Sequence, residues 1–142
     1  MNGKLFIIRQ YIIYKYNAKG AFSIHSPFVF ELFNNVIKRK KHKKSLKKNA
    51  LIENLNAYYT DFNILNLSLK VSYKEVADKI KNPFTILLFH DIHACKENFD
   101  SWKRFINMEE NFISIDLFFI GLIINNPYVK QKQHYILRNS SL

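Results

Sequence analysis

Hydrophobic residues recur along this chain of 142 residues with two different periods, which divide it into helices and strands. Spacings of three and four residues predict helices, whereas short apolar runs bounded by polar or turn-forming residues predict strands. We therefore expect helices at 4–16, 27–37, 49–59, 73–80 and 96–106, and strands at 63–67, 84–89, 112–119, 122–124 and 135–137. Strands that alternate with helices are typical of an α/β fold.

The first two helices are expected to form a pair. Residues 4–16 are apolar nearly all round, which is typical of a helix packed on most of its sides. Ser26-Pro27 predicts the start of the second helix, because serine can cap a helix and proline is pre-set for its first turn. Ser72 is the corresponding predicted cap of the helix at 73–80.

Two later segments are expected to contribute residues to the hydrophobic core. Residues 84–89 read F-T-I-L-L-F, which is typical of a strand buried on both faces of a parallel sheet. The next two strands are expected to be separated near Gly121, and Trp102 is expected in the core. Asp116 lies in an apolar strand, so it needs a partner or water to offset its burial.

Composition narrows the class of protein. The chain is 48% hydrophobic, which is too apolar for a disordered protein and enough for one domain with a core. No segment approaches the ~20 apolar residues of a membrane span, and no signal-peptide cleavage site follows the first apolar stretch. With a single cysteine, the chain suits a reducing compartment. We expect a cytoplasmic protein without a membrane partner.

The net charge of +11 has two interpretations. Residues 38–48 contain eight of the 22 basic residues, so the charge is concentrated in one run. The run is either a solvated linker or a nucleic-acid-binding segment that uses Lys40, Lys41, Lys43 and Lys44. The linker interpretation is favoured, because the run lacks the interleaved aromatic residues that stack on single-stranded bases.

The stretch L-L-F-H-D-I-H-A-C at 87–95 gathers possible metal ligands or proton-transfer groups: His90, Asp91, His93 and Cys95. If the strand continues to the cysteine, the last three share one face; if a turn begins at the aspartate, the four diverge. A structural zinc site is not expected, because the chain has no second cysteine and only three other histidines.

Two groups of motifs resemble a family of class I S-adenosylmethionine-dependent methyltransferases found in Bacteroidota. The first is S-I-H-S-P-F-V-F at 23–30 within residues 16–37. The second combines F-H-D-I-H-A-C at 89–95, a following helix with a tryptophan, I-D-L-F-F-I-G-L-I-I-N at 115–125 and Q-K-Q-H-Y-I-L-R at 131–138. The family has similar I-H-S-P-F-V-Y, F-D-D-I-H-W-S and I-D-L-F-x-x-G-I-V-F-F segments. The resemblance covers about two-thirds of the chain.

The resemblance implies a Rossmann-like sheet, S-adenosylmethionine as cofactor and a methyl acceptor as substrate. It places Asp91 and His93 at catalytic positions, His25 on the substrate side, and Asn66, Ser68 and His90 at cofactor-binding positions. His90 stands where the family has the first acid of its D-D-I-H motif. Because a neutral imidazole is a poor ligand for magnesium-like cations, no metal is expected.

Comparison with the family motifs also shows a gap: the family's glycine-rich cofactor loop has no counterpart in this chain. Asn66 and Ser68 stand where the family has the acid and the first glycine of an E-L-G-T-x-x-G loop, and no glycine occurs between Gly20 and Gly121. Glycines at such a turn let backbone amides approach the cofactor. We expect an N-terminal helical segment at 1–37, a lysine-rich linker at 38–48 and an incomplete methyltransferase domain at 49–142.

The gap leaves three hypotheses about function. The first is a degenerate methyltransferase-like protein with impaired or lost cofactor binding. The second is a nucleic-acid-binding module that uses the lysine run. The third is a non-catalytic remnant that forms homodimers, because deletion of the sheet's middle would leave strand edges and apolar faces to be covered.

Overall fold

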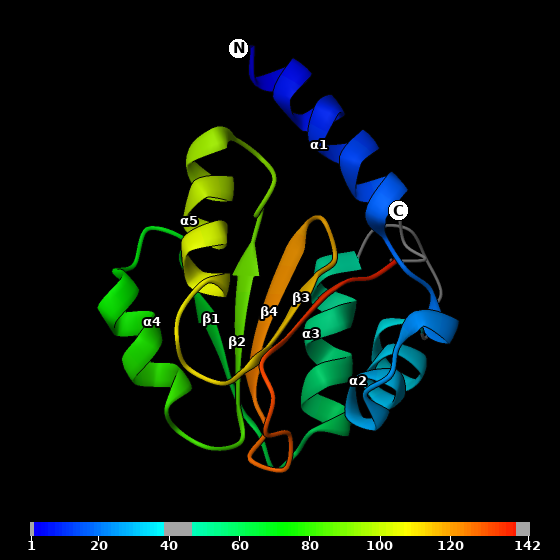
Figure 1. Ribbon diagram of the computed structural model, residues 1–142, viewed down its shortest axis with the longest axis vertical. Coiled ribbons are helices and arrows are strands. Elements are labelled where there is room, and N and C mark those ends of the chain that lie inside the picture. Colours follow the sequence, from blue (N-terminus) through cyan, green and yellow to red (C-terminus); the bar gives the residue numbers. More distant parts are fainter. Residues whose placement is uncertain (1, 39–46, 139–142) are drawn as a thin grey trace.

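The computed structural model describes residues 2–38 and 47–138, and within this part five strands form one mixed sheet with helices on both faces (Figure 1). The predicted α/β class is therefore confirmed. The helical elements are α1 (Gly3–Asn17), a 3-10 turn (Ala21–Ser23), α2 (Pro27–Leu32), a π-helical turn (Phe33–Ile37), α3 (Lys47–Tyr58), α4 (Tyr73–Ile80) and α5 (Lys96–Ile106). The strands are β1 (Asn63–Leu67), β2 (Thr85–His90), β3 (Ile113–Asp116), β4 (Ile120–Asn125) and β5 (Gln133–Ile136).

The sheet has the order β1-β2-β4-β3-β5. Strands β1 and β2 are parallel and are joined through α4, which makes a Rossmann-like β-α-β unit. Strand β4 runs antiparallel to both of its neighbours, β2 and β3, whereas β5 pairs with β3 in parallel. The carboxyl ends of β1, β2, β3 and β5 therefore lie along the same edge of the sheet.

Alternate residues of the strands supply two separate cores. From β2, Ile86 and Leu88 pack under α2 and α3, while Leu87 and Phe89 pack under α4 and α5. The prediction that this strand is buried on both faces is confirmed, although only one of its two neighbours is parallel. Burial on both faces makes β2 the centre of the fold.

The strand break predicted near Gly121 lies just before this residue, which itself belongs to β4. The turn between β3 and β4 lies at residues 117–119, where Phe118 has a φ of 73°, and Gly121 is paired with Phe89 inside the sheet. A Cβ at this position would lie 2.6 Å from the nearest carbon of the Trp102 ring. The glycine is therefore needed for the close packing of α5 on β4, and Trp102 is buried as predicted.

Helix α1 differs most from its prediction. Only Gln10 and Tyr14 are buried in it, so the expectation of a helix packed on most sides is wrong. Figure 1 shows α1 standing off from the sheet, beyond the ends of β2 and β3. The segment that follows is held by backbone hydrogen bonds: Lys19 N donates to Ile136 O (2.8 Å) and Arg138 N donates to Lys19 O (2.9 Å).

The predicted helix caps are present. Ser26 Oγ accepts a hydrogen bond from Val29 N at the start of α2, and Ser72 Oγ accepts one from Glu75 N at the start of α4. A serine at this position satisfies one of the amide groups that a helix leaves without an intrahelical partner. In the described ranges, no helix combines the length and the hydropathy required to cross a membrane.

Candidate functional site

A polar cavity of about 410 Å³ lies beyond the carboxyl ends of the parallel strands β1 and β2. Ligands of α/β proteins gather at this edge, because loops leave the sheet there and their backbone groups are not used by strand pairing. The cavity brings together four of the residues that the sequence singled out, with four others beside them: Asn66, Leu67, Ser68, Leu69, Lys70, His90, Asp91 and Asn98.

One wall of the cavity forms because β2 stops at His90. Asp91 has a φ of 58°, in the left-handed region that breaks a strand and that aspartate tolerates better than most residues. The amide of Asp91 donates to Phe119 O (2.7 Å), and Asn98 Nδ2 donates to Asp91 O (2.9 Å). Of the two arrangements considered for 90–95, the turn at the aspartate is the one observed: His90 and Asp91 line the cavity, whereas His93 and Cys95 do not.

The other wall is the loop from β1 to α4. Ser68 Oγ accepts a hydrogen bond from Lys70 N (3.1 Å), and Ser68 O accepts one from Val71 N (3.2 Å). Ser72 Oγ accepts from Glu75 N (3.1 Å) at the start of the helix. The amides of Lys70, Val71 and Glu75 are therefore bonded within this loop and its helix cap.

His93 lies outside the cavity, in a buried polar cluster that it forms with Gln10 and Asp116. Its Nε2 is 2.7 Å from Asp116 Oδ2, and its Nδ1 is 2.9 Å from Gln10 Oε1. The exposed fractions are 8% for the glutamine, 6% for the histidine and 4% for the aspartate. Asp116 thus has the partner that its burial requires, as expected for an acid in an apolar strand.

Two rings enclose the imidazole of His93. The Phe99 ring stacks on one side with its centroid 4.9 Å away, and the Phe118 ring stacks with its centroid 5.0 Å away. The second oxygen of the carboxylate, Asp116 Oδ1, accepts from Phe118 N (2.8 Å), which fixes the β3–β4 turn. With both ring nitrogens bonded and both faces covered, the histidine joins α1, α5 and the β3–β4 hairpin.

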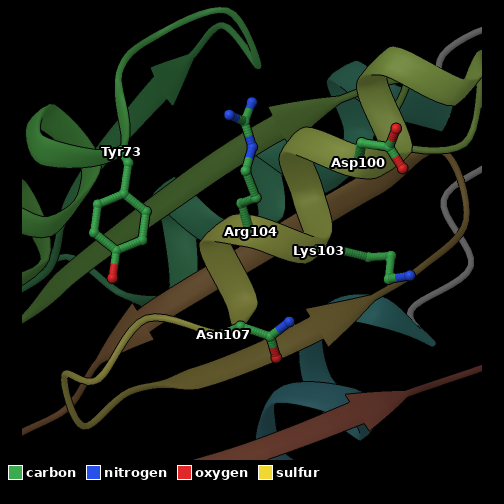
Figure 2. Close-up of a pocket in the computed structure, with 5 residues that line it drawn as sticks. All are labelled: Tyr73, Asp100, Lys103, Arg104 and Asn107. Atoms are coloured by element: carbon green, nitrogen blue, oxygen red, sulfur yellow. The ribbon is translucent and has the colours of Figure 1, made fainter.

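A second depression lies on the outer surface between the start of α4 and the length of α5. Figure 2 shows Tyr73 from α4 facing residues of and just after α5: Asp100, Lys103, Arg104 and Asn107. The Lys96 ammonium donates to Asp100 (2.8 Å) and holds the pKa of that carboxyl below its ordinary value. These side chains are exposed and engage mainly neighbours on their own helix.

The remaining predicted residues lie elsewhere. His25 is exposed before α2 and is not among the residues that line the cavity. Lys40, Lys41, Lys43 and Lys44 fall outside the described residues. Cys95 precedes α5 and is a free thiol. Within residues 2–38 and 47–138, no group of three or more His, Cys, Asp or Glu side chains is placed to hold a metal ion.

Three residues of these sites were not singled out from the sequence. Gln10 interrupts the apolar pattern of α1, which was a signal for a buried polar contact, but its partner is 83 residues away. Lys70 and Asn98 line the cavity from loop and helix positions where polar residues are common, so no local signal distinguishes them from surface residues.

Comparisons with protein-family models, with curated proteins and with solved structures find no match to this chain. The arguments about function therefore rest on the cavity, the buried cluster and the motifs quoted above.

Proposed function

We propose that the chain is a methyltransferase-like protein that does not bind S-adenosylmethionine and does not transfer methyl groups. The motif resemblance and the Rossmann-like β1-α4-β2 unit support the first part. The position of the cavity supports it too, because this edge of the sheet is where α/β proteins bind ligands.

The β1–α4 loop supports the second part of the proposal, that the chain does not bind S-adenosylmethionine. Tight binding of a large cofactor requires backbone donors that point into the site at a turn without side chains. Here the loop reads S-L-K-V-S, its leucine is buried, and Lys70 N and Glu75 N already donate to serine hydroxyls. The donor set of this wall does not fit the cofactor of the family.

The polar groups around the cavity come from both walls. Asp91 and Lys70 give the cavity one charge of each sign, and Asn66, Asn98 and Ser68 add neutral donors and acceptors. At about 410 Å³ the cavity is near the lower end of the range typical of small-molecule sites. The cavity therefore has the size and polarity of a site for a small polar molecule.

Isothermal titration with S-adenosylmethionine and with S-adenosylhomocysteine tests the proposal. We expect no saturable heat at millimolar ligand. A matched variant, Asn66→Glu with Ser68→Gly, restores the acid and the glycine of the family motif. Saturable heat in the variant alone would show that these two positions account for the loss of cofactor binding. No heat in either protein would show that the rest of the family's loop is also required. Saturable binding to the unaltered chain would overturn the proposal.

A further inference from the structure

The outward face of α1 carries a stripe of exposed apolar side chains. Leu5, Ile8, Ile12 and Tyr16 follow one another at intervals of three and four residues, so they share one side of the helix. Their exposed fractions are 59%, 56%, 63% and 88%. A contiguous apolar surface of this kind on a folded protein marks an interaction site, because its exposure to water is unfavourable.

The structure leaves this stripe accessible because α1 is attached through its opposite side. Phe6, Gln10 and Tyr14 face the body, where they contact the Phe99 ring, the His93 ring and Leu137 O. The far end of α1 projects beyond the sheet (Figure 1). The fully exposed Phe22, in the 3-10 turn after α1, adds an aromatic side chain.

The charge around the stripe has a single sign. The first thirty residues contain four cations, Lys4, Arg9, Lys15 and Lys19, and no acid precedes Glu31. All four cations are exposed. A partner for this surface must therefore offer apolar material together with negative charge.

We propose that α1 docks on an anionic membrane surface. Its apolar stripe would enter the boundary between headgroups and acyl chains, while the flanking lysines and arginine contact anionic headgroups. Lysine and arginine stems can extend along an apolar face and keep their charges at the polar boundary. The helix lies on the membrane in this arrangement, which is distinct from the membrane span that the sequence excludes.

A second copy of the chain fits this face less well than an anionic lipid surface does. Pairing of two α1 helices would bring two sets of the same four cations together, in a protein whose net charge is already +11. Like charges in close contact are destabilising, and no acidic residue of α1 is present to offset them. Charge complementarity thus favours the lipid.

Flotation with lipid vesicles tests this assignment. The full chain is mixed with vesicles of phosphatidylcholine alone or of phosphatidylcholine with phosphatidylserine, and the bound fraction is measured. We expect binding to the anionic vesicles only, weakened at least tenfold by Leu5→Gln with Ile12→Gln. The matched control, Phe30→Gln, alters an exposed aromatic on α2 and should leave binding unchanged. Circular dichroism verifies that each variant is folded.

The charge contribution is tested in the same assay. Lys4, Arg9 and Lys15 changed together to Gln should reduce binding more than Lys74, Lys81 and Lys130 changed to Gln, which removes the same charge elsewhere. Full binding by the Leu5→Gln/Ile12→Gln variant would overturn the proposal and assign any lipid affinity to other cations, including the run at 38–48. No vesicle binding, together with a dimer that this variant dissociates, would identify a second copy as the occupant.

Discussion

Two polar regions lie beyond the carboxyl ends of the parallel strands, and they differ in how their polar atoms are satisfied. At the ends of β1 and β2, His90 and Asp91 line a cavity. At the end of β3, Asp116 binds His93 in a cluster closed by two phenylalanine rings. Only two residues separate the two histidines, yet the turn at Asp91 places one at a candidate ligand site and the other in the core.

The comparison of the two regions shows that one backbone conformation, the left-handed φ of Asp91, can direct neighbouring residues of a short motif to different parts of the structure. The resemblance placed Asp91 and His93 together at catalytic positions. Here the polar atoms of His93 are used to hold α1 and the β3–β4 turn in place. We therefore expect the buried cluster to govern stability and the cavity to govern ligand binding, and the following variants test that division.

Asp116→Ala should have the largest effect. It leaves a buried histidine without its carboxylate and Phe118 N without its acceptor, so we expect a loss of about 4 kcal/mol in the free energy of unfolding. Asp91→Asn is the matched control in the cavity region, because asparagine tolerates the left-handed backbone at this position, and we expect its loss to be below about 1 kcal/mol. The two losses in the free energy of unfolding are measured by urea denaturation. Similar losses in both would contradict the division.

Gly121→Ala tests the packing that places α5, which contributes to both regions. The added Cβ would lie 2.6 Å from the Trp102 ring, so either the ring or the strand must move. We expect a loss of about 3 kcal/mol. The control is Gly20→Ala, since a Cβ there meets no atom within 4 Å. If Gly121→Ala left the free energy of unfolding unchanged, α5 would not be packed closely on β4.

Gln10→Leu should act locally. It removes the partner of His93 Nδ1 and one of the few contacts between α1 and the body, and we expect a cost of about 2 kcal/mol. Hydrogen exchange should accelerate in the amides of α1 much more than in those of β2, because the sheet retains its own cores. An equal acceleration in both elements would mean that α1 and the sheet unfold as one unit.

Much of the fold follows from the chain's local patterns. The predicted bounds of β1, α4 and α5 match the structure, because each combines a clear period with a cap or a turn at its ends. The serine caps follow from the same local chemistry. Sequence also indicated that Asp116 needs a partner. The resemblance placed residues 66, 68 and 90 at cofactor-binding positions and residue 91 at a catalytic one, and all four line the same cavity.

The parts that were not predicted depend on contacts between distant residues. The close packing at Gly121 could not be predicted, because the Trp102 ring that fills the space of the absent side chain comes from another element. The apolar residues of α1 looked like core, since periodicity cannot show whether a neighbour is present to cover them. The pairing of His93 with Asp116 depends on where the β2 turn directs the ring.

The most direct test compares the two histidines in the same experiment. Equilibrium unfolding is measured for His90→Gln and His93→Gln beside the unaltered chain. The division predicts that His93→Gln loses about 3 kcal/mol, because a buried ring with two hydrogen bonds and two stacked neighbours is replaced. It predicts a loss below about 1 kcal/mol for His90→Gln at the cavity. Equal losses, or a larger loss at His90, would contradict it.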